Sequence, residues 1–397
     1  MPSPLQTLFL QLHQELVSSK LLWQPSLFVN PAPSWLKLYP ALTEQCLSLS
    51  ENQLTELEQQ PELLPQWLSA HLPHIAQVTA LTELEMNAPT AAALPKQWDA
   101  GIPGRKAKQI KAFAEAFKPE GDILVDWCSG KAHLGRTLSA LYTTPCLALE
   151  YNPTLCQQGN VLARKRNLNT HFVATDVLKP GIALPASSHI CALHACGDLH
   201  RSLVAHATSH PVAALTFAPC CYPLWLDDTY TPLSNTALKH NLQLDRTDLH
   251  LAVQECVTAT PREQSLSHKQ ATWRLGFDCL QRDIRQSDSY LNTPSLPLSA
   301  LNNGFEHYCR TLAALKNLTL PQNIQWQHYE KAGEARWAKL RRLQLVRHAY
   351  RRALELWLVL DLALRLEEAN YTVTINQFCD RALTPRNIII NAKLNTH

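Results

Sequence analysis

The fold is decided by the stretch DILVDWCSGKAHLGRTLSALY, which runs from Asp122 to Tyr142. Its first part, Asp122–Trp127, is a short apolar run with β-branched residues, which predicts a buried strand. Its last part, Lys131–Tyr142, has apolar residues at helical spacing. A turn of this kind lets backbone N–H groups and a small residue approach a ligand closely. The stretch therefore predicts a strand, a ligand-binding turn and a helix.

The same alternation of strand and helix continues downstream. Four more apolar runs predict strands at residues 146–150, 171–176, 189–195 and 212–219. Helical spacing predicts helices among these strands, at residues 153–167 and 199–209, and the first of them begins with a proline. Strands that alternate with helices form a parallel sheet that is covered on both faces. The expected fold class is therefore α/β.

The C-terminal residues extend this sheet. A long helical pattern covers residues 338–369, and two strands are expected at residues 370–378 and 387–392. Five parallel strands, one helix and a final hairpin give a predicted sheet of seven strands. We therefore expect four regions: a helical N-terminal domain (1–95), a core (96–222), an insertion after the fifth strand (223–330), and a final helix with a hairpin (331–397).

Composition narrows the class of protein. The 397 residues are 46% hydrophobic and 17% charged, which is typical of globular chains. No run of about 18 apolar residues occurs, so we expect no membrane span. The twelve cysteines have no export signal before them, which indicates reduced thiols in a cytoplasmic protein. No CxxC pattern occurs, so the sequence has no zinc-ribbon signature.

Charge is distributed unevenly along the chain. Residues 1–95 hold two lysines and eight acids, a net −6, so the remainder has 34 basic and 25 acidic residues, a net +9. A basic body fits a polyanion such as RNA, although scattered surface charge gives the same balance. We expect the long C-terminal helix to bind RNA through a row of exposed arginines: Arg341, Arg347, Arg351 and Arg352. A solvated helix face is the alternative.

Small and acidic residues follow three of the predicted strands. In nucleotide-binding loops, three alternate positions are usually glycines, and here they are Cys128, Gly130 and Ala132. Glu150 ends the second strand, where a carboxylate can accept hydrogen bonds from ribose hydroxyls. Asp176 ends the third strand and could accept from an adenine amino group. No GxxxxGK[ST] motif is present, which argues against an NTPase.

Three motifs, in this order, carry a family resemblance: VDWCSGKAHLGR (Val125–Arg136), LHACGDL (Leu193–Leu199) and APCCY (Ala218–Tyr222). They resemble a methyltransferase-like family that includes methyltransferase-like proteins of animals and the glutathione S-transferase C-terminal-domain-containing protein. More distantly, the chain is similar to the tRNA ribose methyltransferases of the acceptor stem. The resemblance covers residues 100–222 and resumes at 367–392. It implies the Rossmann-like class I methyltransferase fold.

The resemblance also implies S-adenosylmethionine as the cofactor. The residues that it implies around the methionine part follow the first strand: Asp126, Cys128, Gly130 and His133. At the end of the second strand, the resemblance implies Glu150 and Tyr151 beside the ribose. At the end of the third strand, it implies Asp176 and Val177 beside the adenine. Those that it implies on the remaining wall end the fourth strand: His194 and Ala195.

Methyl transfer mainly requires alignment of the nucleophile and exclusion of water, because the cofactor is already activated. A hydroxyl acceptor also needs a base or a lysine, whereas an amine needs only to be neutral. The residues expected near the methyl group are Asp198, Lys131, Tyr222, Cys220 and Cys221. We expect APCCY to shape the acceptor side of the pocket, with Tyr222 facing the substrate. A covalent route through Cys220 or Cys221 is an alternative.

Cysteines at three strand ends raise the question of a metal. Cys128, Cys196 and the pair Cys220–Cys221 would share one rim of the sheet, close to His194, and such ligands can hold zinc. A metal there would occupy the space of the cofactor and the substrate, and buried cysteine is common as a small apolar residue. We therefore expect no metal. A disulfide between adjacent cysteines would be strained.

The sequence thus predicts an S-adenosylmethionine-dependent methyltransferase that acts on tRNA or rRNA. One alternative keeps the methyl transfer but moves it to a protein or a small molecule. Another is a methyltransferase-like binding protein without catalysis, which the incomplete glycine loop favours. Three basic residues before the first strand would touch the cofactor carboxylate or phosphate, or lie in a solvated helical turn: Arg105, Lys106 and Lys108.

Overall fold

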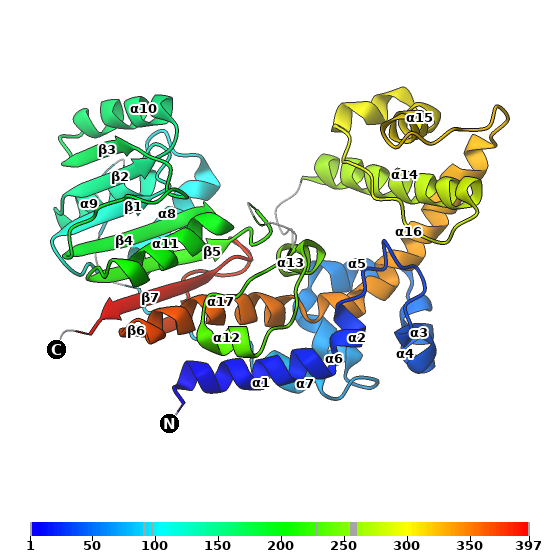
Figure 1. Cartoon of the computed structure of the whole chain (residues 1–397), viewed down its shortest axis with the longest axis horizontal. Coiled ribbons are helices and arrows are strands. Elements are labelled where there is room, and N and C mark those ends of the chain that lie inside the picture. The colour runs from blue at the N-terminus through cyan, green and yellow to red at the C-terminus, as the bar shows by residue number, and fades with distance from the viewer. Residues whose placement is uncertain are drawn as a thin grey trace. The chain divides into compact units, whose positions relative to one another are not determined.

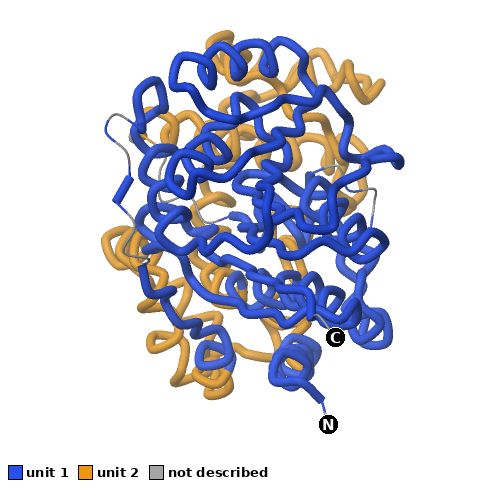
Figure 2. Tube along the Cα trace, turned by 90° about the vertical axis from the view of Figure 1, so that its left-hand side faces the viewer, with its two compact units in different colours: residues 1–17, 78–257, 351–397 blue, residues 18–77, 258–350 orange. Residues whose placement is uncertain are grey.

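The computed structural model describes residues 2–89, 93–94, 96, 98–224, 226, 229–254 and 260–395. The chain forms two compact units, each from segments that are distant in sequence (Figure 2). The first consists of residues 1–17, 78–257 and 351–397, and the second of residues 18–77 and 258–350. This differs from the expected division, because most of the N-terminal region joins the insertion. The expected boundary at residue 95 lies outside the described residues.

The first unit contains a seven-stranded sheet in the order β3-β2-β1-β4-β5-β7-β6 (Figure 1). Its strands are β1 (Ile123–Trp127), β2 (Cys146–Glu150), β3 (Thr170–Ala174), β4 (Ser188–Cys196), β5 (Ala214–Cys220), β6 (Tyr371–Gln377) and β7 (Ile388–Leu394). The first five run parallel, and β7 pairs antiparallel with β5 and β6. The predicted class I methyltransferase fold is confirmed. Strand order reverses between β1 and β4, where open α/β sheets bind ligands.

Helices of the same unit cover both faces of the sheet (Figure 1). α9 (His133–Tyr142), α10 (Pro153–Arg164), α11 (Asp198–Ser209) and α17 (Arg351–Glu368) contact its strands, and α8 (Gly104–Ala116) packs against α9. The unit also contains α1 (Pro4–Ser18), α12 (Asn235–Lys239) and α13 (Arg246–Val253), of which α12 and α13 pack against α17. Phe113 and Phe117 lie fully buried in one cluster with Leu124 of β1 and Leu138 of α9. This burial fixes the helix that precedes β1 and the helix that follows it on the same face of the sheet.

The second unit is helical. It contains α2 (Lys20–Trp23), α3 (Trp35–Leu38), α4 (Pro40–Leu47), α5 (Glu51–Gln59), α6 (Leu64–Leu68), α14 (Pro261–Arg285), α15 (Phe305–Leu315) and α16 (Trp326–His348), and α7 (Ile75–Ala80) spans its boundary. Leu54 and Leu57 of α5 pack against Leu345 of α16. Short helices cannot bury their apolar faces alone. This explains why residues 18–77 fold with residues 258–350.

The predicted single helix over residues 338–369 is wrong, because the structure ends α16 at His348 and begins α17 at Arg351. No proline or glycine marks this break in the sequence. Contacts within the second unit fix the end of α16 instead. The Tyr350 hydroxyl hydrogen-bonds the His74 ring at 2.7 Å, and Arg347 Nε donates to the Trp23 carbonyl at 2.6 Å. Local periodicity carries no information about such distant partners.

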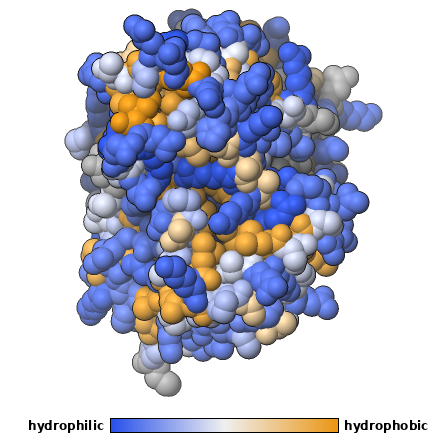
Figure 3. Space-filling view, turned by 90° about the vertical axis from the view of Figure 1, so that its right-hand side faces the viewer, coloured by the Kyte–Doolittle hydropathy of each residue, from blue (hydrophilic) through white to orange (hydrophobic). Residues whose placement is uncertain are grey.

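None of the described helices combines the length and the apolar character needed to cross a membrane. Figure 3 shows one face of the molecule, on which apolar residues form separate patches among hydrophilic ones. Leu38 and Leu315 are examples of apolar side chains that are more than half exposed, at 64% and 53%. Scattered apolar residues of this kind are ordinary on a protein surface.

A buried carboxylate fastens the chain that follows β5 to α17. Asp361 of α17 is fully buried. It accepts hydrogen bonds from the Tyr230 hydroxyl at 2.6 Å, from Leu233 N–H at 2.9 Å, and from both the N–H and the hydroxyl of Ser234 at 2.8 Å. Such a carboxylate is stable in the interior because several donors satisfy it. It therefore holds residues 230–234 in place just downstream of the APCCY motif.

We predict that Asp361→Ala lowers the free energy of unfolding by about 3 kcal/mol, because it leaves several buried donors without an acceptor. Denaturant unfolding followed by circular dichroism measures this loss. Asp122 is an exposed acid of the same unit, so Asp122→Ala is the matched control and should leave the free energy of unfolding unchanged. Equal stabilities of the two variants would contradict the anchoring role of Asp361.

Candidate active site

The loop after β1 has the conformation of a glycine-rich loop although it holds one glycine. Cys128, Gly130 and Ala132 have φ angles of +57°, +58° and +49°. These are the three alternate positions where related loops have glycines. A side chain in this left-handed region is sterically costly, so the surrounding structure must hold it there. Three alternate residues of the loop therefore adopt a backbone conformation that normally favours glycine, and two of them carry a side chain.

Asp126 lies beneath this loop and is only 3% exposed. Its Oδ2 accepts a hydrogen bond from Gly135 N–H of α9 at 2.8 Å. Gly135 permits this approach, since a Cβ there would lie 2.8 Å from Asp126 Cβ. Burial raises the pKa of Asp126 to about 7, although the Gly135 hydrogen bond and the charges of Lys106 and Arg136 oppose this shift. Asp126 therefore joins the start of α9 to the end of β1.

Glu150 at the end of β2 is fixed by two backbone donors. Gly130 N–H donates to its Oε2 and Asn152 N–H donates to its Oε1, each at 2.8 Å. The carboxylate thus connects the loop after β1 to the start of α10. Each carboxylate oxygen has a further lone pair for a ligand.

A cavity of about 380 Å³ lies beside this carboxylate, at the carboxyl ends of β1, β2 and β3. Five of the predicted cofactor residues line it: Cys128, Glu150, Tyr151, Asp176 and Val177. Four further lining residues were missed by the sequence analysis: Leu149, Thr175, Leu178 and Leu199. They are direct neighbours of predicted residues or of the LHACGDL motif, which is the signal that could have found them. Among the described lining residues, the other five predictions are absent: Asp126, Gly130, His133, His194 and Ala195.

Several cations surround His133 at the start of α9. The ring is 8% exposed, and its Nδ1 lies 2.9 Å from the Arg136 guanidinium. Burial, together with the charges of Arg136, Lys106, Lys131 and Arg166, lowers the pKa of His133 to about 4. The imidazole is therefore neutral at physiological pH. The cations belong to α8, to the loop after β1, to α9 and to the chain after α10, so four separate segments direct positive charge at this one ring.

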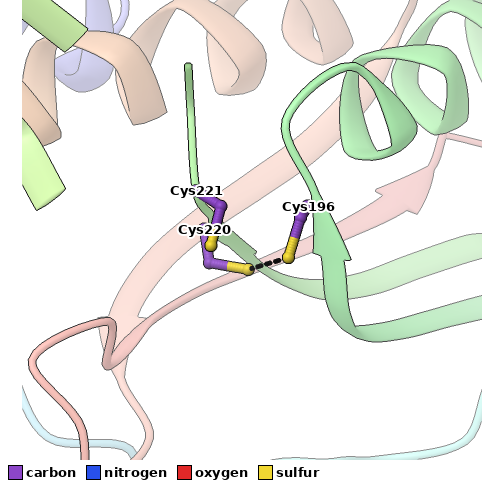
Figure 4. A group of neighbouring side chains, drawn as sticks. All are labelled: Cys196, Cys220 and Cys221. Atoms are coloured by element: carbon purple, nitrogen blue, oxygen red, sulfur yellow. Dashed lines mark hydrogen bonds between the residues drawn. The ribbon is translucent and has the colours of Figure 1, made fainter. Parts of the chain in front are cut away.

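The ends of β4 and β5 gather three thiols (Figure 4). A bulge after Leu193 shifts the register so that Cys196 becomes the Cα partner of Cys220. Their sulfur atoms are 3.3 Å apart, and the Sγ atoms of Cys196, Cys220 and Cys221 all lie within 4.8 Å of one another. His194 within the bulge has a φ of +75° and Cys221 a φ of +48°. Two left-handed residues therefore bring the thiols together.

The three thiols differ in acidity. Hydrogen bonds from Cys196 and Cys220, together with the charges of Arg386 and His194, lower the pKa of Cys221. The pKa of Cys220 is raised by its hydrogen bonds to the other two thiols and by burial. Arg386, which lies between β6 and β7, donates a hydrogen bond to the Val253 carbonyl. Of the three thiols, Cys221 is therefore the one that loses its proton most readily.

The other candidate catalytic residues have different surroundings. The expectation that Tyr222 faces the substrate is wrong, because it is 3% exposed and its ring contacts His200 edge to face at 5.6 Å. Asp198 begins α11 and pairs with Arg201 at 3.1 Å. Lys131 lies half-buried in the loop after β1. Ala195 is buried, and its carbonyl accepts a hydrogen bond from His200.

The expected row of exposed arginines is not formed. Arg347 is 4% and Arg351 8% exposed. Arg341 pairs with Glu58 at 2.5 Å and with Glu51 at 2.9 Å. Arg352 pairs with Glu355 at 2.8 Å and donates to Asn387 Oδ1 at 3.0 Å. These side chains hold helices in place within their own units, so the basic pattern of the sequence reflects internal pairing.

The buried carboxyl of Asp126 makes stability depend on pH. Its pKa of about 7 in the fold exceeds that of an unfolded aspartate, about 4. Its ionisation therefore destabilises the fold as pH rises, and stability is regained as pH falls below about 7. Asp126→Asn keeps an acceptor for Gly135 and cannot ionise.

Relative to the wild type, Asp126→Asn should gain about 2.5 kcal/mol of unfolding free energy between about pH 5 and pH 8. Urea unfolding at both pH values measures this difference. Asp122→Asn is the control, because this exposed carboxyl should show no such gain. A pH-independent difference between Asp126→Asn and the wild type would contradict the raised pKa.

Comparison with known proteins finds a family model that matches part of the chain. Residues 105–225 match the family described as a methyltransferase domain. No curated protein sequence matches the chain. Among solved structures, the Pyrococcus abyssi tRNA (uracil-54, C5)-methyltransferase, solved with S-adenosyl-L-homocysteine, is similar over 28% of this chain and 28% of its own, with 16% identity and a TM-score of 0.24.

Two further solved structures are each similar to about a third of this chain. An RNA methyltransferase from Salinibacter ruber, solved with S-adenosyl-L-homocysteine, covers 33% of this chain and 86% of its own, with 13% identity and a TM-score of 0.24. Precorrin-6y C5,15-methyltransferase from Geobacter metallireducens covers 32% and 67%, with 14% identity and a TM-score of 0.25. Likenesses this partial carry no argument about the substrate. Residues 105–225 therefore match a methyltransferase domain and lie in a sheet that has the strand order of the class I methyltransferase fold.

Proposed function

We propose that this chain is a methyltransferase that transfers the methyl group of S-adenosylmethionine to RNA. The cavity beside β2 fits such a cofactor, because it combines two carboxylates with apolar walls. Glu150 would accept from the ribose hydroxyls, and Asp176 would accept from the adenine amino group. Leu149, Val177 and Leu199 would contact the apolar faces of the ligand. When bound, the cofactor supplies an activated methyl group, so the chain itself needs only to align the acceptor and exclude water.

The observation that favours RNA is the positive charge directed at His133. Lys106, Lys131 and Arg166 act on one imidazole although they come from separate elements, and Lys106 also acts on His194 at the end of β4. Cations that surround a ligand site attract a polyanion and orient its phosphates. The proposal of an RNA substrate therefore rests on these three cations and not on the arginines of α16 and α17.

The residues near the thiol cluster would then form the acceptor side. Lys131 could lower the pKa of a hydroxyl acceptor, and Asp198 could accept a proton as a base. Tyr222 would act only through packing, since its hydroxyl is buried. A covalent route would use Cys221, which has the lowest thiol pKa of the cluster.

The cofactor assignment predicts the effect of two substitutions. Glu150→Ala and Asp176→Ala should each weaken S-adenosylmethionine binding about 10- to 100-fold, because each removes a hydrogen-bonding carboxylate. Isothermal titration calorimetry measures this affinity. Asp122→Ala should bind like the wild type, since Asp122 lies at the opposite end of β1. Unchanged affinity in both cavity variants would remove Glu150 and Asp176 from the site.

The RNA assignment predicts that binding of bulk tRNA or rRNA weakens steeply with salt. Lys106→Glu and Lys131→Glu should each weaken it further and make the salt dependence shallower, because fewer counterions are released. Lys239→Glu is the control, since Lys239 is an exposed lysine of α12 in the same unit. Fluorescence anisotropy at several salt concentrations measures these effects.

Mass spectrometry of nucleosides then tests the reaction itself. RNA from cells without the gene should lack one methylated nucleoside, and the wild type and Lys239→Glu should restore it. Asp176→Ala should not restore it. An unchanged nucleoside profile together with salt-insensitive RNA binding would reject RNA and favour a protein or small-molecule acceptor. A chain that does not bind S-adenosylmethionine would favour the non-catalytic alternative.

A further inference from the structure

The thiol cluster of Cys196, Cys220 and Cys221 requires an unusual backbone. Adjacent residues of an extended strand point to opposite faces, so Cys220 and Cys221 would ordinarily diverge. The left-handed φ of Cys221 turns its side chain back toward Cys220, and the bulge at His194 turns Cys196 toward both. Strain of this kind is held at functional sites more often than elsewhere. The structure therefore maintains a convergence of three sulfur atoms at a cost in backbone energy.

The spacing of the sulfur atoms suits a metal ion. A tetrahedral zinc with bonds of about 2.3 Å holds its thiolates about 3.8 Å apart. The Cys196 and Cys220 sulfurs are 3.3 Å apart, and all three lie within 4.8 Å of one another. Small side-chain rotations therefore convert the cluster into a set of three ligands (Figure 4). No other group of histidines, cysteines or acids among the described residues meets the same condition.

A metal bound to these three cysteines would not fill the cavity beside β2. None of its three cysteines is among the described residues that line the cavity beside β2. Cys128 lines that cavity but is not part of the cluster. The cavity lies mainly at the ends of β1, β2 and β3, with Leu199 after β4 as a further wall, whereas the thiols lie at the ends of β4 and β5. Both can be occupied at once.

The surroundings also favour a thiolate-bound ion. Zinc with three thiolates carries a net charge of −1, which needs a positive neighbour. Arg386 and His194 lie close enough to Cys221 to interact with its charge. Cys220 is 6% exposed, whereas Cys196 and Cys221 are half-buried, so a fourth ligand can approach from the open side. Three protein ligands with one open position are typical of catalytic rather than structural zinc sites.

We propose that Cys196, Cys220 and Cys221 bind one thiophilic divalent ion, Zn²⁺, and leave its fourth position open. Each cysteine binds as a thiolate, and each thiol proton passes to the solvent. The ion joins the end of β4 to the end of β5 and so stabilises the two left-handed residues. Its open position faces away from the thiols and takes water or a donor atom of the substrate. Binding of the ion does not depend on the identity of the methyl acceptor.

The test uses the full-length reduced protein under anaerobic conditions, with Co²⁺ as a spectroscopic probe. One equivalent of Co²⁺ should produce thiolate-to-cobalt charge-transfer bands in the near ultraviolet and tetrahedral d–d bands in the visible. One equivalent of Zn²⁺ should then abolish both sets of bands. Competition with a chromophoric chelator gives the affinity for Zn²⁺.

Cys196→Ser, Cys220→Ser and Cys221→Ser should each weaken Zn²⁺ binding by at least about 100-fold, as expected when a ligand is lost rather than a neighbour of a ligand. Cys279→Ser is the matched control, because Cys279 is a half-buried thiol of the second unit. It should bind Zn²⁺ like the wild type. Circular dichroism establishes which variants fold, and the titration of the wild type does not depend on them.

Three results would overturn the proposal. The first is the absence of cobalt–thiolate bands in the wild type. The second is full Zn²⁺ affinity in all three cluster variants that fold. The third is a disulfide between Cys196 and Cys220 that persists in protein purified under reducing conditions. None of these results would affect the test of S-adenosylmethionine binding, so the metal proposal and the proposed function can fail separately.

Discussion

The site depends on left-handed backbone at the carboxyl edge of the parallel sheet. Four residues with side chains have backbone φ angles in the region that normally favours glycine: Cys128, Ala132, His194 and Cys221. Cys128 and Ala132 shape the loop in which Gly130 N–H donates to Glu150, and His194 and Cys221 lie where the three thiols converge. The buried sheet supplies the rigidity that holds these turns. The cavity and the thiol cluster are therefore two results of one constraint.

Hydrogen bonds to three carboxylates hold the loops at the strand ends and the helices that flank them in place. Asp126 holds Gly135, Glu150 holds both Gly130 and Asn152, and Asp361 holds the segment after β5. In each case a carboxylate near a strand end or on a helix accepts from the backbone N–H of another loop or element. These contacts fix the loops around the site without requiring regular secondary structure there.

Much of the sheet could be predicted from the sequence, because strands and helices leave local periodic patterns. The strand-end residues Cys128, Glu150 and Asp176 were found for the same reason, since position at the end of a strand determines which edge they share. The break between α16 and α17 could not be found, because it depends on His74 and Trp23. The arginines were misplaced in the same way, since Glu51 and Glu58 lie nearly three hundred residues away from Arg341. The convergence of the thiols depends on the bulge at His194, which no sequence period marks.

The division of both units into separated segments has a consequence for synthesis on the ribosome. The chain passes between the two units four times, and the sheet gains its last strand only from residues 388–394. Until β7 emerges, one edge of β5 has no partner, and an unpaired strand edge is prone to pair with other chains. That edge of β5 therefore stays unpaired while the residues between 220 and 388 are synthesised. A helper that shields exposed strands during elongation would act at β5.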